Sequence, residues 1–332
     1  MFYLRKIIIF FFLTLFLILL IYFLIPAEKP KGTIFGVTFS IPQAKNLGLD
    51  WKTAYLAVLD ELKVRYLRLP VYWSEIEPEK DKYYFEDIDW QINEASKRGA
   101  KIILVIGRKQ PRWPECFIPN WVKNLTLADQ KEETLKMIQE LILRYKKEPT
   151  IVSWQVENEA LMPYGICPKA DKKFLDREIS LIRSLDSRPI LLTDGGKVSF
   201  WIESGRRAAL LGISLYKINT INIFGRKFLF HSDFIPDSFY QKKARLISFF
   251  FPNLRDIYIT ELQAEPWFEK PINQTSLEEQ FKTMDITRFK KMVEIGRNLG
   301  FSQTYFWGVE WWYWLKETQS YPDFWNEAKK LF

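Results

Sequence analysis

The sequence predicts a (β/α)8 barrel, or TIM barrel, an α/β fold in which eight parallel strands alternate with helices. Eight short runs are rich in β-branched or aromatic residues: 33–40, 66–73, 101–107, 151–156, 189–194, 210–216, 256–261 and 303–307. Segments of helical periodicity separate most of them, chiefly 51–62, 88–98, 128–147, 170–185 and 277–299. Regular alternation predicts a parallel sheet, and eight units predict its closure into a barrel.

Two glycines agree with the proposed helix ends. Gly99 and Gly300 stand where a helix gives way to the next strand, the position that tolerates a positive φ. The rival fold is a doubly wound open sheet, which would place a glycine-rich nucleotide loop after its first strand. The residues that follow Ser40 contain no such loop, so the barrel is favoured.

The domain organisation follows from length and from the absence of a second linker. Residues 27–32 are polar, carry Pro30 and form a short predicted linker. The 300 residues from 33 to 332 suit one barrel, because such barrels commonly run to about 250 residues or more. We therefore expect 33–332 to be a single catalytic barrel domain.

The N-terminus predicts a membrane anchor. Residues 7–26 are apolar apart from Thr14, Tyr22 and the final proline, and a helix of about 20 apolar residues crosses a bilayer core. Arg5 and Lys6 favour a cytoplasmic N-terminus. Residues 1–26 are thus expected to be a cytoplasmic stub and a transmembrane signal-anchor, with the barrel outside the cytoplasm. Secretion after signal cleavage is the alternative, but no small-residue cleavage site follows the run.

Composition excludes several classes of function. The net charge of +8 arises from Lys and Arg scattered among 40 acidic residues, with no long basic run, so nucleic-acid binding is not expected. One His and two Cys with no metal spacing predict neither a metal site nor a cofactor. The 13 Trp residues suit a core or flat apolar ligand surfaces. Oligomeric state is not predicted.

Two glutamates end predicted strands and carry the functional hypothesis. Glu159 follows the fourth strand and Glu261 ends the seventh, and barrel active sites gather at the carboxyl ends of strands. Glycosidic cleavage needs two carboxyl groups, one that protonates the leaving oxygen and one that attacks the anomeric carbon or activates water. Each glutamate alone could equally be a surface charge or a neighbour of a helix cap.

Three motifs together resemble the clan A glycoside hydrolases, which include cellulase-like and β-galactosidase-like families. They are Asn158-Glu159 on strand four, Glu261 after Ile-Thr on strand seven, and Leu-Arg68-Leu-Pro-Val on strand two, and the resemblance runs from about residue 33 to 314. It implies that Glu159 is the general acid/base and Glu261 the nucleophile. Arg68 would keep Glu261 ionised, and Asn158 would bind the hydroxyl beside the reacting carbon.

The same resemblance assigns two aromatic residues and a reaction. Tyr216, at the end of strand six, would donate to the nucleophile, and Trp307 on strand eight would form the floor under the sugar. The implied reaction is hydrolysis of a β-linked glycan or oligosaccharide with retention, for which the two carboxyl groups lie about 5 to 5.5 Å apart. Transglycosylation on the same scaffold and a membrane-tethered, non-catalytic carbohydrate-binding barrel are the alternatives.

Further residues at the predicted rim are weaker candidates for sugar contacts. The loop after strand three offers Gln110, Arg112 and Trp113, where many clan members carry a His that this chain lacks. The remaining candidates follow strands seven and eight: Gln263, Glu265, Trp267, Trp311 and Trp312. For these residues, ordinary loop structure or core packing is an equally good interpretation.

The two cysteines are expected to form a disulfide. Cys116 and Cys167 fall in the loops after strands three and four, which are neighbours in a barrel. Outside the cytoplasm such a pair is oxidised, and the bridge would hold two rim loops together. A free buried pair is the alternative.

Overall fold

The strands close into a barrel. The computed structural model describes residues 2–24, 32–223, 226–267 and 270–332. The barrel strands, all parallel to their neighbours, follow the order β1-β10-β9-β6-β5-β4-β3-β2. Their bounds are β1 Ile34–Thr38, β2 Tyr66–Pro70, β3 Lys101–Ile106, β4 Ile151–Val156, β5 Ile190–Gly195, β6 Leu210–Leu215, β9 Asp256–Gln263 and β10 Gln303–Trp307. The predicted eight-stranded parallel barrel is confirmed.

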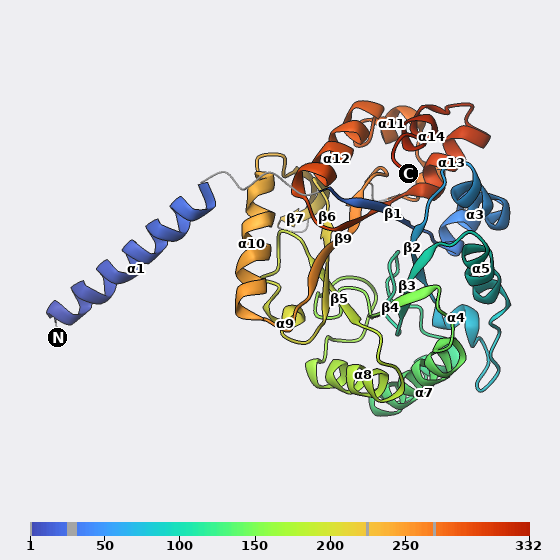
Figure 1. Cartoon of the computed structure of the whole chain (residues 1–332), viewed down its shortest axis with the longest axis horizontal. Helices are drawn as coiled ribbons and strands as arrows, with labels where there is room; N and C mark the ends of the chain where they lie inside the picture. Colours follow the sequence, from blue (N-terminus) through green and yellow to red (C-terminus); the bar gives the residue numbers. More distant parts are fainter. Residues whose placement is uncertain (1, 25–31, 224–225, 268–269) are drawn as a thin grey trace.

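Helices surround this barrel on its outer side (Figure 1). The longer ones are α3 Trp51–Asp60, α5 Glu86–Lys97, α7 Leu127–Tyr145, α8 Lys172–Leu185, α10 Asp237–Phe250, α12 Ile286–Leu299 and α13 Val309–Thr318. Shorter helices are α2 Ile41–Asn46, α4 Trp73–Ile76, α6 Asn120–Lys123, α9 Ile202–Gly205, α11 Leu277–Phe281 and α14 Asp323–Ala328, with a 3-10 turn at Ile272–Gln274. The single helix expected over 277–299 is divided, because the Asp285 side chain caps a new helix by accepting from the Arg288 N–H.

Apolar side chains fill both sides of the barrel wall. The main core lies between strands and helices, and a second cluster comprises Ile103, Leu191, Leu210, Tyr258 and Tyr305. On β3, Ile102 and Leu104 join the main core whereas Ile103 joins the second cluster, as alternating side chains of one strand require. The second cluster therefore packs inside the barrel.

Two glycines end helices as the sequence predicts. Gly99 follows α5 with φ +66°, and Gly300 follows α12 with φ +64°. This left-handed conformation is open to glycine without the steric cost that a Cβ imposes.

An antiparallel hairpin and a helix lie between β6 and β9, and neither was predicted from the sequence. The hairpin consists of β7 Ile218–Ile223 and β8 Arg226–His231, and α10 follows it. Lys197 holds the hairpin to the barrel rim. Its ammonium group donates to the Tyr216 carbonyl, to Asn219 and to Ser232 at 2.8 to 2.9 Å.

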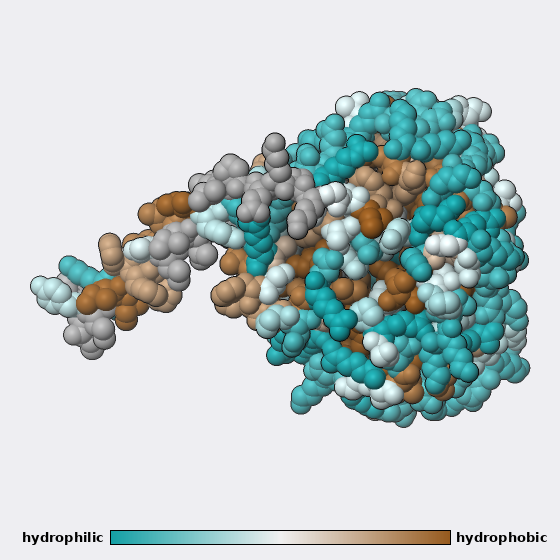
Figure 2. Space-filling view, in the orientation of Figure 1, coloured by the Kyte–Doolittle hydropathy of each residue, from teal (hydrophilic) through white to brown (hydrophobic). Residues whose placement is uncertain are grey.

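The N-terminal helix α1 spans Phe2–Leu24 and projects away from the barrel (Figure 1). Exposed apolar side chains gather on it, whereas much of the visible face of the helical ring is hydrophilic (Figure 2). Within the described part of the chain, no helix is long and apolar enough to cross a membrane. The transmembrane part of the prediction therefore lacks support, and 25–31, with most of the predicted linker, lie outside the described residues.

Substitution of Gly36 on β1 measures how tightly the barrel wall is packed. A Cβ at this position would lie 2.4 Å from the Tyr66 carbonyl oxygen and 2.9 Å from the Tyr305 ring. Gly36→Ala is expected to lower the free energy of unfolding by about 1 to 3 kcal/mol, the usual cost of overpacking. Urea unfolding measures this cost, with Ser96→Ala on the exposed face of α5 as the control. Unchanged stability in Gly36→Ala would show that the wall yields there.

Candidate active site

Arg68 on β2 organises the carboxyl end of the barrel. Its side chain is fully buried, and its three shortest hydrogen bonds reach residues on two other strands or their ends. It donates from Nε to Gln155 Oε1 at 2.7 Å, from one terminal nitrogen to Glu261 Oε1 at 2.9 Å, and from the other to Asn158 Oδ1 at 2.7 Å. Because a buried guanidinium must be paired, this residue fixes the positions of Glu261 and Asn158 relative to each other.

Both carboxylate oxygens of Glu261 accept hydrogen bonds. Arg68 donates to Oε1, and the Tyr216 hydroxyl donates to Oε2 at 2.8 Å. Burial and the charge of Glu261 raise the pKa of Tyr216 well above its ordinary value, so the hydroxyl keeps its proton. Such an arrangement suits an ionised carboxylate with one oxygen beside a neutral donor.

Glu159 lies in a different environment, although it is close enough to Glu261 for the two carboxyl groups to form one cluster. Ser214 Oγ donates to its Oε1 at 2.7 Å. Burial first, and then the charge of Glu261, raises the pKa of Glu159 to about 7, while the Ser214 hydrogen bond opposes this rise. One carboxyl group is therefore paired with a cation, and the other, with a pKa of about 7, is still partly protonated near neutral pH.

The backbone around Glu159 is held in a sparsely populated conformation. Glu157 and Glu159 have φ values of +57° and +45°, in the left-handed region. The Glu159 N–H donates to Thr193 Oγ1 at 2.7 Å, and the Glu157 carboxylate accepts from the Arg108 and Lys109 backbone N–H groups. These contacts fix a turn whose conformation costs on the order of 1 to 3 kcal/mol per residue.

Arg112 lies over the predicted sugar platform. Its guanidinium is 4.0 Å from the Trp307 ring centroid and is ion-paired with Glu265 and, at 3.0 Å, with Glu310. Arg112 Nε and Glu265 Oε2 are buried polar atoms without a hydrogen-bond partner. The predicted rim residues Arg112, Glu265 and Trp307 are thus brought together.

Other predicted sugar contacts are already engaged in the fold. The Gln263 amide is buried, accepts from the Lys217 and Ile218 backbone N–H groups and donates to the Ile218 carbonyl. It therefore fastens the hairpin. Trp311 and Trp312 are fully buried and donate to Gln280 and to the Ala264 carbonyl, which matches the core interpretation.

Three further residues predicted to contact sugar lie in loops. Trp113 is 73% exposed. Gln110 is buried and donates to the Gly107 carbonyl, and Trp267 packs edge-on against Tyr216 with its indole N–H on Thr220. Of these three, Trp267 is in direct contact with a residue of the carboxylate cluster.

Several residues of the site were not identified from the sequence. They are Glu115, Gln155, Thr193, Ser214 and Glu310. Thr193 and Ser214 are small polar residues near the carboxyl ends of apolar strands, which is a usable signal. Glu115 carries no such signal, because it lies in a loop and reaches the site only through tertiary structure.

Cys116 and Cys167 form a disulfide with their Cα atoms 5.3 Å apart. The bridge joins the loop after β3 to the loop after β4. Cys116 directly follows Glu115 in the chain, so the bridge lies next to that residue.

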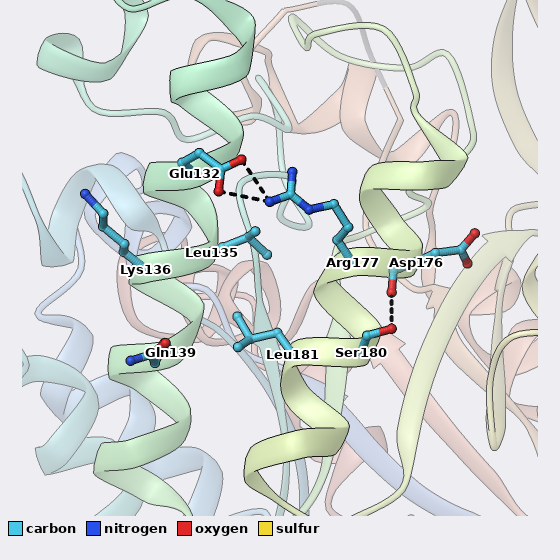
Figure 3. A pocket seen from close by; sticks show the side chains of 8 residues that line it. All are labelled: Glu132, Leu135, Lys136, Gln139, Asp176, Arg177, Ser180 and Leu181. Carbon is cyan, nitrogen blue, oxygen red and sulfur yellow. Dashed lines mark hydrogen bonds and ion pairs between the residues drawn. The ribbon is translucent and has the colours of Figure 1, made fainter.

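One surface groove lies away from these residues. A groove of about 570 Å³ runs between α7 and α8, and the Glu132–Arg177 ion pair crosses it (Figure 3). It contains none of the buried carboxyl groups described above. Among the described residues, no cluster of three or more His, Cys, Asp or Glu is arranged to hold a metal ion.

Comparison with known proteins gives a family match and several structural likenesses. The family model described as cellulase, glycosyl hydrolase family 5, matches residues 33–214. Among curated proteins, none matches this chain in sequence.

Similar solved structures share the barrel. A GH5_18 variant from Bifidobacterium longum subsp. longum, in complex with Manβ1-4GlcNAc, has a TM-score of 0.58 at 12% identity, covering 83% of this chain and 68% of that one. GH5_18 from Streptomyces cattleya, with GlcNAc, has 0.57 at 12%, covering 84% and 71%. Xylanase 10B from Thermotoga petrophila RKU-1, with xylobiose, has 0.54 at 13%, covering 86% of each chain. At such identities these likenesses establish the fold alone.

Removal of the Ser214 hydroxyl tests the electrostatics of Glu159. Ser214→Ala deletes a hydrogen bond that favours the charged carboxylate, so the pKa of Glu159 is expected to rise above its value of about 7. Carbon-13 NMR titration of labelled glutamate side chains measures the shift, with Ser180→Ala on the exposed face of α8 as the control. An unchanged or lower pKa in Ser214→Ala would contradict the described contact.

Removal of the disulfide tests its contribution to stability. The double variant Cys116→Ser/Cys167→Ser frees a loop with a sequence separation of 51, which in the chain-entropy model costs roughly 4 kcal/mol of unfolding free energy. Denaturant unfolding measures this, and reductant should destabilise the wild type but leave the double variant unaffected. Two free thiols in the purified oxidised protein, or equal stability with and without reductant, would rule out the bridge.

Proposed function

Because this chain belongs to the cellulase family of glycosyl hydrolases, family 5, we propose that it cleaves β-linked glycans by double displacement with retention of configuration. The observation that carries the mechanistic part is the contrast between two carboxyl groups in one cluster. Glu261 is paired with Arg68, whereas burial and the nearby charge raise the pKa of Glu159 to about 7. Retaining cleavage needs one ionised nucleophile and one proton donor.

In the first step, a carboxylate oxygen of Glu261 forms a bond to the anomeric carbon as the glycosidic bond breaks. Glu159 transfers its proton to the departing oxygen, so the leaving group is a neutral alcohol. In the second step, Glu159, now ionised, removes a proton from water. The water oxygen displaces Glu261 from the anomeric carbon, and both carboxyl groups return to their starting states.

Neighbouring residues have positioning and binding roles in this proposal. Arg68 holds the nucleophile and, through the same guanidinium, orients Asn158 toward the hydroxyl beside the reacting carbon. Tyr216 donates to Glu261 and can shift its hydrogen bond as the ester forms. Trp307 offers an indole face to the sugar once Arg112 leaves or shares that face.

The substrate class in the proposal is carbohydrate, without further identification of the sugar. The similar barrels contain mannose, N-acetylglucosamine and xylose units in their complexes, which supports a glycan ligand of β-linked type. Transglycosylation is the close alternative, because an acceptor sugar can replace water in the second step. Products formed with and without acceptor sugars separate the two reactions.

We also propose that the barrel works outside the cytoplasm. The Cys116–Cys167 disulfide supports this location, since such bonds persist in oxidising compartments. The membrane anchor remains a prediction from residues 7–26 alone. Cell fractionation with protease protection tests both points: a cytoplasmic, protease-protected protein would contradict export, and release into the medium would contradict anchoring.

Replacement of the two glutamates tests the mechanism. A panel of 2,4-dinitrophenyl β-glycosides of glucose, mannose, galactose, xylose and cellobiose supplies a leaving group that needs no protonation. Glu261→Ala should lose at least about 1,000-fold in kcat, because it removes the covalent step. Glu159→Ala should form the glycosyl-enzyme but hydrolyse it slowly.

Azide rescue distinguishes the two roles. Added azide should give an inverted glycosyl azide from Glu261→Ala and a retained glycosyl azide from Glu159→Ala. Glu132→Ala, on the exposed face of α7, is the control and should match the wild type. Unchanged activity in Glu261→Ala, or a retained azide product from it, would eliminate Glu261 as the nucleophile.

A further inference from the structure

A third carboxyl group, that of Glu115, belongs to the same cluster and has no part in the mechanism above. Glu115 lies in the loop after β3, and its Oε2 accepts from Asn158 Nδ2 at 3.4 Å. This is a long contact, at the limit of hydrogen-bond distance. Among the described residues it is the one hydrogen bond that the Glu115 carboxyl group makes, so most of its capacity is left for another partner.

The chain holds Glu115 firmly despite this weak contact at its tip. Its φ is +74°, a conformation that glutamate seldom adopts. Its carbonyl accepts from the Gln110 N–H and its own N–H donates to the Arg112 carbonyl, both at 2.7 Å. A Cβ at Gly165 would lie 2.4 Å from the Glu115 Cβ, so only glycine lets the next loop approach so closely.

The next residue strengthens this placement. Cys116 is disulfide-bonded to Cys167, and the Ile166 N–H donates to the Pro114 carbonyl at 3.0 Å. The loops after β3 and β4 are thus clamped together on either side of Glu115. The backbone of Glu115 is therefore firmly positioned, whereas its carboxyl group makes only one long hydrogen bond. This combination is typical of a residue that binds a ligand.

The charges around Glu115 determine its protonation. Burial, followed by the charges of Glu261 and Glu159, raises the pKa of Glu115 to about 8, while Lys109 and the Asn158 amide oppose the rise. The group is therefore protonated at neutral pH and carries an O–H donor. A protonated Glu115 gives the site a further hydrogen-bond donor and adds no negative charge beside Glu261.

We propose that Glu115 is a substrate-binding residue that, beside Asn158, donates a hydrogen bond to the hydroxyl on C2 of the sugar whose anomeric carbon is attacked. The inference rests on the proposed function. Arg68 holds both Glu261, which would bond to C1, and Asn158, whose amide nitrogen points toward Glu115. In the proposed function Asn158 binds the hydroxyl beside the reacting carbon, which is the C2 hydroxyl, so this group would lie between the Asn158 amide and Glu115.

The competing interpretation makes Glu115 only a support for Asn158. Asn158 Oδ1 is already fixed by Arg68 at 2.7 Å, with Thr193 and Gln155 at 3.3 and 3.4 Å. An amide held so well at its oxygen gains little from a further support at its nitrogen. A direct hydrogen bond to the sugar gives the Glu115 carboxyl group a second partner.

The test measures the coupling between Glu115 and the C2 hydroxyl. The probes are the 2,4-dinitrophenyl β-glycoside of the panel that the wild type cleaves fastest and its 2-deoxy counterpart. Glu115→Ala should lower kcat/KM about tenfold on the hydroxylated glycoside, the worth of one good hydrogen bond, and by less than about threefold on the 2-deoxy glycoside. Glu115→Gln keeps an N–H donor and should stay within about threefold of the wild type on both.

Two further measurements separate direct contact from support. In an Asn158→Ala background, the Glu115→Ala loss on the hydroxylated glycoside should persist. On the dinitrophenyl glycoside, whose leaving group needs no proton from Glu159, the alkaline limb of kcat/KM should report the ionisation of Glu115 in the wild type and should be absent from Glu115→Gln. Circular dichroism of each variant reports its folding, and Glu115→Gln keeps the side chain's size should Glu115→Ala misfold.

Equal losses on the two glycosides, or a loss that vanishes without Asn158, would overturn the contact while leaving the proposed function intact. An unaltered alkaline limb in Glu115→Gln would count against it as well. A wild-type protein that cleaves no glycoside of the panel would instead overturn the proposed function, and the inference with it.

Discussion

The buried charge of Arg68 is the constraint on which the rest of the site depends. A guanidinium removed from water must be paired and hydrogen-bonded, and its planar fork fixes the directions in which partners lie. Arg68 therefore ties β2 to Gln155 and Asn158 at the end of β4 and to Glu261 on β9. One buried side chain thus sets the geometry of Glu261, the proposed nucleophile, and of Asn158, which precedes the proposed acid Glu159.

The remaining carboxyl groups are held at a cost to stability. Glu159 and Glu115 keep protons in the folded protein at pH values where the unfolded chain, with its ordinary pKa of 4.5, has lost them. Because the folded state binds more protons in this range, the free energy of unfolding falls as pH rises from about 4.5 through about 7 and 8. The Cys116–Cys167 bridge and the closed barrel offset this cost. The bridge lies directly after the left-handed residue Glu115, and Thr193 accepts from the backbone N–H of the left-handed residue Glu159.

The barrel and its two principal glutamates were predictable because their signals are local. The composition of a strand such as 151–156, or a glycine such as Gly99 at a helix end, indicates the local conformation within a few residues. Eight strand-helix units in succession then favour one topology, the closed barrel. The hairpin at β7 and β8 escaped detection because Lys197 and Gln263, distant in sequence, hold it to the rim. Glu115 escaped for the same reason, and the buried Trp312 shows that aromatic density cannot distinguish a core from a sugar platform.

In the proposed mechanism, Glu261 forms a covalent bond to the sugar, and Glu159 donates a proton in the first step and accepts one in the second. The protein can be incubated with a 2,4-dinitrophenyl 2-deoxy-2-fluoro-β-glycoside. The fluorine destabilises the positively charged transition state and so slows breakdown of the glycosyl-enzyme, which then accumulates. Peptide mass spectrometry after digestion then locates the label. We expect one fluoroglycosyl group per protein molecule, attached to Glu261 on β9. A label on any other side chain would contradict this mechanism.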